Sequence, residues 1–399
     1  MNGPRFASIA WLPLIALFGL SGCDVDLFGP RTDPAPRPPE LPEDRGVALT
    51  ADEVSSNSHL AWSRNGREIF YQQSATWTIE GQARPPAIKA VDVSNKTTRT
   101  VDARYSAYYG LTLSADGETL YFMAHDDPSG VGFGLYSASA HGEQSALLAK
   151  PVDLLGVTFR GPPGFSLAPD NVHVAYSGRD SLFVHNVADD QRRFLATSAE
   201  PQAFSPDGRR LLFTDWDRDW VPGGPPEYTD LIFALDTGEQ EPVSLGPTRS
   251  GRSFVNSLRL QSVRWDVIGI RVLYMRLLSG DGEFFIYDVS RGADTRLAFD
   301  LREGEAGTWF AEGWSEDGSK LAFWSSACLR RSAGSLFGYT CYESETHLHV
   351  TDADGEGDTI VAVAYVGEDV SSWRRAAFAP DGTRIAYILD GRIYVQEIP

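Results

Sequence analysis

The chain has 399 residues, with 35 Lys and Arg against 54 Asp and Glu, which gives a formal net charge of −19 at pH 7. This acidic balance argues against binding nucleic acid or an anionic lipid surface, because both repel a negatively charged protein. It suits a soluble body in an extracytoplasmic space, or a cationic partner.

Residues 1–22 have the pattern of a secretory signal peptide. Arg5 precedes an apolar run from Ile9 to Leu20, which is too short to cross a bilayer as a helix. The run leads into Ser21-Gly22-Cys23, and small residues before a lone cysteine resemble a bacterial lipobox. The resemblance implies cleavage before Cys23 and attachment of lipid to that residue. The alternative is an ordinary signal peptide in which the cysteine is incidental.

Residues 23–45 form the next segment, in which Cys23 is followed by a proline-rich stretch. The prolines are Pro30, Pro34, Pro36, Pro38, Pro39 and Pro42, and large apolar residues are few. Such a composition cannot bury enough apolar surface to fold, so we expect a semi-extended tether. At about 3 Å per residue, it would hold a folded body several tens of Å from the lipid.

Residues 46–399 contain one ten-residue frame that occurs seven times. The frame begins with a large apolar or aromatic residue, continues through a tight turn and ends in Phe or Tyr. Its fifth position is Gly in six copies and Asn171 in the third, and these are the residues that best adopt a left-handed conformation. The copies begin at Trp62, Leu113, Leu167, Phe204, Trp265, Trp314 and Phe378, with a period of about fifty residues.

Alternating runs between the frames predict two further strands in each repeat. Each repeat is then a four-stranded antiparallel blade, with strands A to D from the axis outward. The seventh copy reaches Pro399 after strand C, and a three-stranded blade would leave an open edge. Because Gly46–Thr50 looks like the other strand D segments, we expect it to pair with Tyr394–Ile398 and close the last blade.

The frame resembles the TolB-like and WD40-like propeller repeat, most clearly in Trp62–Tyr71, Phe204–Phe213, Trp314–Phe323 and Phe378–Tyr387. The same repeat type occurs in the propeller domain of prolyl oligopeptidases. The resemblance covers nearly all of residues 46–399. It implies an all-β fold, a seven-bladed β-propeller whose last blade is closed by an N-terminal strand. It leaves function open, since propellers host unrelated activities.

Motifs for catalysis are weak in this sequence. There is no G-x-S-x-G nucleophile elbow, the nearest match being Gly164–Ala168 inside the third repeat. A phosphate-binding glycine loop is missing as well. We therefore predict no catalytic residue and no cofactor.

Two groups of side chains are weak candidates for a metal site. Asp352, Asp354, Glu356 and Asp358 have the spacing of an EF-hand loop, but Val363 occupies the position of the bidentate glutamate. An acidic hairpin turn explains these residues equally. His347 and His349 share one face of a predicted strand C, without an identifiable third ligand. We expect them to be two polar groups on a half-exposed sheet, and we predict no metal.

Cys328 and Cys341 are the only other cysteines, and in an oxidising compartment we expect them to form a disulfide. Two buried free thiols are the alternative.

Several predicted B–C and D–A connections, among them a B–C insertion over Ser325–Glu343, are long and rich in aromatic residues, which are enriched at binding hot spots. Trp77, Trp216, Trp220, Tyr228, Phe337, Tyr339 and Trp373 are the candidates for a binding face. The alternative is that they pack the loops onto the blades.

These observations favour a lipid-anchored propeller in the cell envelope, facing the periplasm or the cell exterior. We expect a binding or scaffolding module, without catalysis, for a protein, a peptide or a cell-envelope glycan. The membrane would be contacted through the lipid anchor only. The alternative is a polysaccharide lyase or hydrolase with its active site in the central funnel.

Overall fold

The computed structural model describes residues 46–398 except for a set of short segments. They are 51–53, 55–57, 78–82, 126–132, 143–144, 150–164, 179–180, 198, 217–227, 236–237, 244–260, 267, 270, 279–280, 298–309, 336–337 and 367–374. The predicted signal peptide, Cys23 and the tether therefore lie outside the described residues. In the described part, no helix is long and apolar enough to cross a membrane.

The described residues form seven four-stranded antiparallel sheets, which we number as blades. The strands are given from the innermost outward. Blade 1 is β2 (Ala61–Trp62), β3 (Glu68–Gln73), β6 (Ala87–Asp92) and β7 (Thr98–Asp102), and blade 2 is β8 (Ala107–Leu113), β9 (Thr119–His125), β10 (Phe133–Ser139) and β11 (Ala146–Ala149). Blade 3 is β12 (Phe165–Leu167), β13 (His173–Gly178), β14 (Ser181–Asn186) and β15 (Gln191–Thr197), and blade 4 is β16 (Ala199–Phe204), β17 (Arg210–Trp216), β18 (Tyr228–Ala234) and β19 (Gln240–Val243).

The remaining blades are built in the same order. Blade 5 is β20 (Gln261–Trp265), β21 (Arg271–Leu278), β22 (Asp281–Asp288) and β23 (Ala293–Arg296), and blade 6 is β24 (Phe310–Trp314), β25 (Lys320–Ser335), β26 (Gly338–Asp352) and β27 (Thr359–Val366). Blade 7 is β28 (Ala376–Phe378), β29 (Arg384–Leu389), β30 (Arg392–Glu397) and β1 (Val47–Ala48). A small hairpin of β4 (Thr76–Trp77) and β5 (Ala83–Arg84) follows β3.

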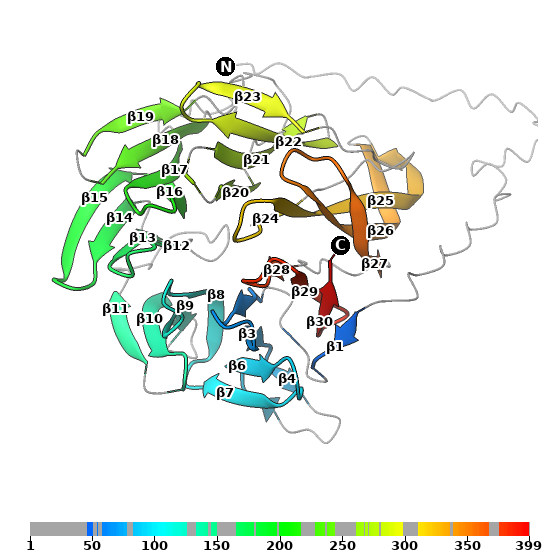
Figure 1. The fold of residues 1–399 in the computed structure, drawn as a ribbon, viewed down its shortest axis with the longest axis horizontal. Coiled ribbons are helices and arrows are strands. Elements are labelled where there is room, and N and C mark those ends of the chain that lie inside the picture. The colour runs from blue at the N-terminus through cyan, green and yellow to red at the C-terminus, as the bar shows by residue number, and fades with distance from the viewer. Residues whose placement is uncertain are drawn as a thin grey trace, which may run out of the picture. The chain divides into compact units, whose positions relative to one another are not determined.

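The blades are arranged around a common centre, and the innermost strand of each blade lies nearest to it (Figure 1). Neighbouring innermost strands touch around most of this ring: β28 with β2, β2 with β8, β12 with β16, β16 with β20, β20 with β24 and β24 with β28. The structure thus confirms an all-β propeller of four-stranded antiparallel sheets.

The sheet of blade 7 contains both ends of the described chain. Val47 lies opposite Val395 and Ala48 opposite Tyr394, so β1 forms the outer edge next to β30 (Figure 1). The Leu49 N–H also donates to the Ile393 carbonyl over 2.8 Å. This strand covers the ladder that β30 would otherwise expose.

The aromatic residue that ends each frame lies in the second strand of its blade and forms the core. Tyr71, Phe122, Tyr176, Phe213, Tyr274, Phe323 and Tyr387 are all at most 2% exposed. Full burial of such a ring is worth a few kcal/mol. The invariant last position of the frame is therefore explained by packing between blades.

The fifth position of the frame has the left-handed backbone that the sequence predicts. Gly208 has φ 70° and Asn171 has φ 59°. The Asn171 side chain adds contacts that glycine lacks, since its Oδ1 accepts from the Ala115 N–H at 2.9 Å and its Nδ2 donates to Asp116 at 3.1 Å. The one copy without glycine thus links the turns of blades 2 and 3.

Arginine at the seventh position of a frame stacks on tryptophan at the first position of the next. The guanidinium carbon lies 5.2 Å from the ring centre for Arg384 and Trp62, 5.0 Å for Arg210 and Trp265, and 5.1 Å for Arg271 and Trp314. Frames that begin with Leu or Phe instead follow Glu68, Thr119, His173 or Lys320 at that position. Each such cation–π contact is worth about 1 kcal/mol, so these pairs help to hold consecutive blades together.

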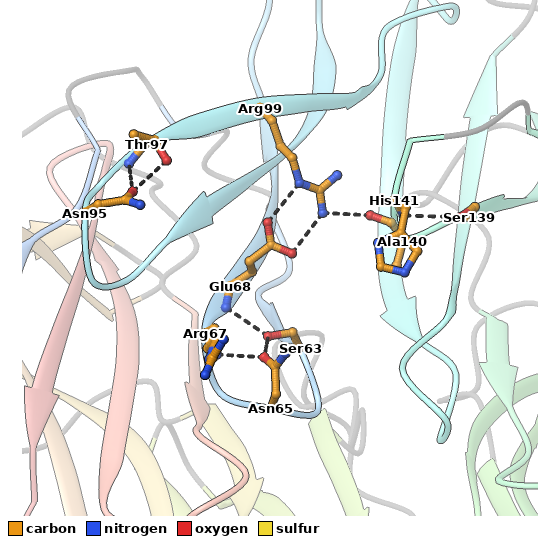
Figure 2. Close-up of polar contacts among 10 residues, drawn as sticks. All are labelled: Ser63, Asn65, Arg67, Glu68, Asn95, Thr97, Arg99, Ser139, Ala140 and His141. Atoms are coloured by element: carbon orange, nitrogen blue, oxygen red, sulfur yellow. Dashed lines mark hydrogen bonds and ion pairs between the residues drawn. The ribbon is translucent and has the colours of Figure 1, made fainter.

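Blades 1 and 2 are also joined through one arginine (Figure 2). Arg99 of β7 donates to both oxygens of Glu68 in β3, at 2.8 and 2.9 Å. Its Nη2 also donates to the Ala140 carbonyl in the turn after β10, at 2.8 Å. One guanidinium therefore holds two strands of blade 1 against a turn of blade 2.

Turn aspartates predict a specific acid sensitivity. The Ser114 hydroxyl donates to Asp116 at 2.5 Å and the Ser315 hydroxyl to Asp317 at 2.6 Å. These bonds favour the ionised carboxylates and, with backbone N–H donors, hold the pKa of Asp116 and Asp317 below the usual 3.8. Since both pKa values are lower in the folded chain, the stability they contribute is complete above about pH 4 and is lost as the pH falls below it.

We expect the Ser114→Ala/Ser315→Ala variant to lose stability less steeply than the parent protein below about pH 4. Urea midpoints measured at a series of pH values test this. Parallel curves for the two proteins would contradict the assigned role of the serines.

Candidate functional site

A cavity of about 720 Å³ lies among the innermost strands. Its walls come from β2, β8, β12, β16, β24 and β28 and from the residues beside them. The lining is His59, Leu60, Ala61, Trp62, Gly110, Leu111, Thr112, Leu113, Phe165, Ser166, Leu167, Gln202, Ala203, Glu312, Trp314, Glu316, Arg375, Ala376, Ala377, Phe378, Ala379 and Pro380. We call it the central cavity.

Irregularities in three innermost strands occur at this cavity. The pairing register shifts around Gln202 in β16, around Glu312 in β24 and around Gly110 in β8. A β-bulge leaves one residue out of the ladder and re-aims its side chain, and bulges are common beside binding sites. Here the unpaired residues are members of the cavity lining.

The bulge in β8 requires glycine at position 110. Its φ is 53°, and a Cβ there would lie 2.7 Å from a ring carbon of Phe165 in the next blade. A side chain at position 110 would therefore displace the Phe165 ring from the cavity wall.

The polar groups of the lining differ in how they are satisfied. Gln202 donates through Nε2 to the Thr214 hydroxyl at 3.2 Å. The buried Nε of Arg375, by contrast, has no hydrogen-bond acceptor among the described residues.

Trp314 also has an unsatisfied donor, unlike the tryptophans that begin two other frames. The indole N–H of Trp62 donates to the Ala377 carbonyl at 2.9 Å, and that of Trp265 to the Ala203 carbonyl at 3.0 Å. The corresponding Nε1 of Trp314 is buried and has no acceptor in the described part of the chain. Trp314 also lines a second space of about 480 Å³ with Pro206, Trp265 and Glu316.

A separate cluster in blade 6 connects the buried Ser325 and His349 to Asp358, which reaches the surface. The Ser325 hydroxyl lies 2.8 Å from His349 Nε2, and His349 Nδ1 lies 2.9 Å from both oxygens of Asp358. The imidazole stacks on Phe323, with ring centres 4.8 Å apart. This is the connectivity of a nucleophilic triad, but Ser325 is 0% exposed, so a substrate cannot reach its hydroxyl.

The expectation that His347 and His349 lie on a half-exposed sheet is wrong. They are 2% and 1% exposed, and His347 bonds to the buried Glu345. Packing of the neighbouring blade covers this face of β26, and strand alternation alone does not report that. Among the described residues, no group of three or more His, Cys, Asp or Glu is placed to hold a metal ion.

The acidic segment after β26 forms a hairpin turn. The Asp352 N–H donates to the Glu356 carbonyl at 2.8 Å, and the Gly355 N–H donates to the Asp352 carbonyl at 2.9 Å. The Glu356 N–H lies 3.3 Å from an Asp354 oxygen. Asp358, the fourth weak metal candidate, is the carboxylate that holds His349.

The aromatic candidates lie in several blades. Trp77 is in β4, Trp216 in β17, Tyr228 in β18 and Tyr339 in β26, while Trp220, Phe337 and Trp373 lie outside the described residues. Trp216 is directly opposite Tyr228, so the structure brings this pair together at the end of blade 4.

One expected B–C insertion is in fact strand. Residues 325–343 belong largely to β25 and β26, which continue as a long paired hairpin. In this register Cys328 lies opposite Ser344 and Cys341 opposite Arg331. A disulfide needs Cα atoms within about 7 Å, so the predicted Cys328–Cys341 bridge would require the ladder to slip.

Sequence reasoning missed Gln202, Glu312 and Arg375. A usable signal is present, because each is a polar residue two or three places before a frame. That position falls on the innermost strand or directly before it, beside the central cavity.

Solved structures support the fold. An oligogalacturonate lyase in complex with manganese matches with a TM-score of 0.57 and 13% identity, covering 88% of this chain and 92% of that chain. An oligogalacturonate lyase from Vibrio parahaemolyticus matches with a TM-score of 0.57 and 10% identity, covering 88% and 93%.

TolB from Acinetobacter baumannii matches with a TM-score of 0.47 and 14% identity. The match covers 76% of this chain and 65% of that protein, so this chain spans less than two thirds of its length. No protein-family model and no curated protein matches the chain. At these identities, the likeness shows a shared propeller fold.

Proposed function

We propose that this protein is a lipid-anchored β-propeller of the cell envelope that binds a ligand in its central cavity without chemically altering it. The observation that carries the proposal is the pair of bulges at Gln202 and Glu312, which add two polar side chains to the lining of a 720 Å³ cavity. Cavities of several hundred Å³ that bring polar side chains together are typical of binding sites.

The location in the envelope rests on the sequence. The apolar run after Arg5 and the small residues before Cys23 favour export and lipid attachment. The strongly acidic body would be repelled by an anionic membrane surface, so the lipid would be its only contact with the bilayer. The ligand class is a protein, a peptide or an envelope glycan.

A non-catalytic role is favoured by the chemistry of the described residues. The Ser325–His349–Asp358 arrangement has a fully buried serine and does not line the central cavity. The cavity itself contributes one histidine, His59, and two glutamates, Glu312 and Glu316. We assign these groups to ligand recognition.

The second candidate is a polysaccharide lyase acting in the same cavity. It is favoured by the fold match to two oligogalacturonate lyases and by the presence of Arg375, His59 and Glu312 in the lining. Incubation with oligogalacturonate and a divalent metal tests it, through the ultraviolet absorbance of an unsaturated product. Product formation that Arg375→Gln abolishes would replace the binding proposal with this one.

Photo-crosslinking in the native envelope tests the binding proposal. A photo-reactive amino acid replaces Gln202 in the cavity or, as the matched control, Phe194 on the outermost strand β15, where the side chain is 53% exposed. We expect a defined adduct from position 202 only. The identified ligand should then bind the purified protein about tenfold more weakly after Glu312→Gln, which removes one charge-assisted hydrogen bond.

Adducts of the same composition from both positions would contradict a cavity site. The anchor is tested separately with Cys23→Ser, which should move the full chain from the membrane fraction to the soluble fraction. Membrane retention of that variant would contradict lipidation at Cys23.

A further inference from the structure

Two buried donors in the central cavity have no acceptor among the described residues, Arg375 Nε and Trp314 Nε1. Native proteins rarely leave buried donors unsatisfied, and each exception calls for an explanation such as a ligand or water. Both groups line the same cavity, and they come from neighbouring blades 6 and 7. Their joint presence indicates a ligand that supplies acceptor oxygens at this side of the cavity.

The repeat itself shows that Trp314 is exceptional. Trp62 and Trp265 occupy the same frame position and give their N–H to a carbonyl of the preceding blade. For Trp314 the preceding innermost strand is β20, whose pairing register shifts between Gln261 and Arg264. The described residues beside the Trp314 ring instead line the second space of about 480 Å³. The Trp314 N–H therefore has no acceptor among the described residues, whereas the N–H groups of Trp62 and Trp265 are hydrogen-bonded.

We infer that the central cavity binds a peptide end bearing a carboxylate, with Arg375 taking the carboxylate and the Trp314 N–H donating to a ligand oxygen. The inference rests on the proposed function and names the ligand class of that site. A guanidinium donates two parallel hydrogen bonds to a carboxylate, and a desolvated pair of this kind is stronger than one between neutral groups. The Nε of Arg375 has no acceptor among the described residues, so this donor is available to a ligand carboxylate.

The rest of the lining fits a peptide better than a uronate glycan. Part of its wall is apolar and half-buried, formed by Leu60, Leu113, Phe165, Leu167, Phe378 and several alanines. Apolar side chains of a peptide lose water favourably against this part, where sugar hydroxyls find no hydrogen-bond partner.

Charge points the same way. Glu312 and Glu316 lie in the same lining as Arg375 and would repel a chain with a carboxylate on every sugar. A peptide end has a single carboxylate beside Arg375, and its backbone N–H groups offer donors to Glu312. A lining with one arginine and two glutamates therefore suits a ligand with one anionic group.

The test uses three probes with the purified lipid-free chain. They are a mixed-sequence hexapeptide library with acetylated N-termini and free C-terminal carboxylates, the same library amidated at the C-terminus, and oligogalacturonate. Bound species are measured by affinity selection and mass spectrometry, and dissociation constants are determined for the best peptides. We expect each selected acid to bind at least about tenfold more tightly than its amide.

Variants identify the donors. Arg375→Gln should weaken the acid by about 10- to 100-fold while leaving the amide nearly unchanged, and Trp314→Phe should weaken ligand binding by about fivefold. Trp265→Phe is the matched control, because Trp265 has the same frame position, does not line the central cavity and already gives its N–H to Ala203. If Arg375→Gln fails to fold, Arg375→Lys keeps the charge and removes the planar pair of donors.

The outcomes separate the two levels of the proposal. Equal binding of acid and amide peptides overturns the carboxylate inference and leaves peptide binding intact. An acid preference that survives Arg375→Gln and Trp314→Phe overturns the assignment of the donors. Selection of oligogalacturonate alone overturns the inference in favour of a glycan, and selection of no probe overturns it together with peptide or uronate binding in this cavity.

Discussion

Replacing Asp266 by Ala should lower the free energy of unfolding by about 3 kcal/mol, the largest effect that we expect from a single residue. Asp266 is 0% exposed, and its carboxylate accepts from the Arg271 backbone N–H at 3.0 Å and from Arg271 Nε at 2.8 Å. The substitution removes two charge-assisted bonds and leaves a buried N–H without its acceptor. Urea unfolding at neutral pH measures the loss.

The divergent frame of blade 5 explains why one carboxylate matters so much. In blade 4, the Ser205 hydroxyl accepts from the Arg210 N–H at 3.0 Å and donates to Asp207 at 2.5 Å. In blade 5 the second position is Asp266 and the fourth is Ile268, which is 64% exposed. Asp266 therefore performs alone what a serine and an aspartate share elsewhere.

A rescue variant makes this prediction specific. Asp266→Ser/Ile268→Asp restores the arrangement of blade 4, so we expect it to recover most of the stability lost in Asp266→Ala. Glu118→Ala is the surface control, because the Glu118 side chain is 68% exposed and pairs with the exposed His141, and its effect should stay within about 0.5 kcal/mol. A double variant as unstable as Asp266→Ala would refute the proposed equivalence.

Replacing His349 by Phe should lower the free energy of unfolding by about 2 to 3 kcal/mol. Phe keeps the ring that stacks on Phe323 but removes the bonds to Ser325 and Asp358. The Ser325 hydroxyl then remains buried without its partner, which is the costly part of the change. Chemical denaturation followed by far-UV circular dichroism reports the difference.

A double variant separates hydrogen bonding from packing at this site. Ser325→Ala/His349→Phe removes both partners, so it should be more stable than His349→Phe alone by about 1 kcal/mol. His141→Ala, at a histidine whose side chain is 72% exposed, should change stability by less than about 0.5 kcal/mol. If the double variant were the less stable of the two, Ser325 would not depend on the imidazole.

The same network has a bearing on function. Its three members have the order and contacts of a hydrolytic triad, but they tie β25 to β26 and to the turn before β27. Geometry alone would suggest catalysis, and burial decides against it. A stability effect without any change in ligand binding is therefore the expected signature of His349.

Most of the fold was predictable because it depends on short-range rules that repeat. Gly208 and Asn171 adopt the left-handed turn that their positions require, and the ring that ends each frame is buried in every blade. Strand alternation also placed the second and third strands of the blades. It failed for residues 325–343, because a long hairpin and a loop insertion have similar composition in sequence.

The central cavity was not predictable in the same way. Gln202, Glu312 and Arg375 are far apart in the sequence, and only the closure of the ring brings them to one lining. The bulges that add Gln202 and Glu312 to it are one-residue shifts in pairing, which change no composition or periodicity that a single sequence reveals.

The sequence alone determined the repeated hairpin, the number of its copies and their burial pattern, since turn chemistry and alternation act over a few residues. Only the tertiary structure decided which polar groups share the cavity and which donors have no acceptor there. It also decided that His349 is buried. These properties depend on the packing of one blade against the next, and that packing is set by contacts between residues tens to hundreds of positions apart.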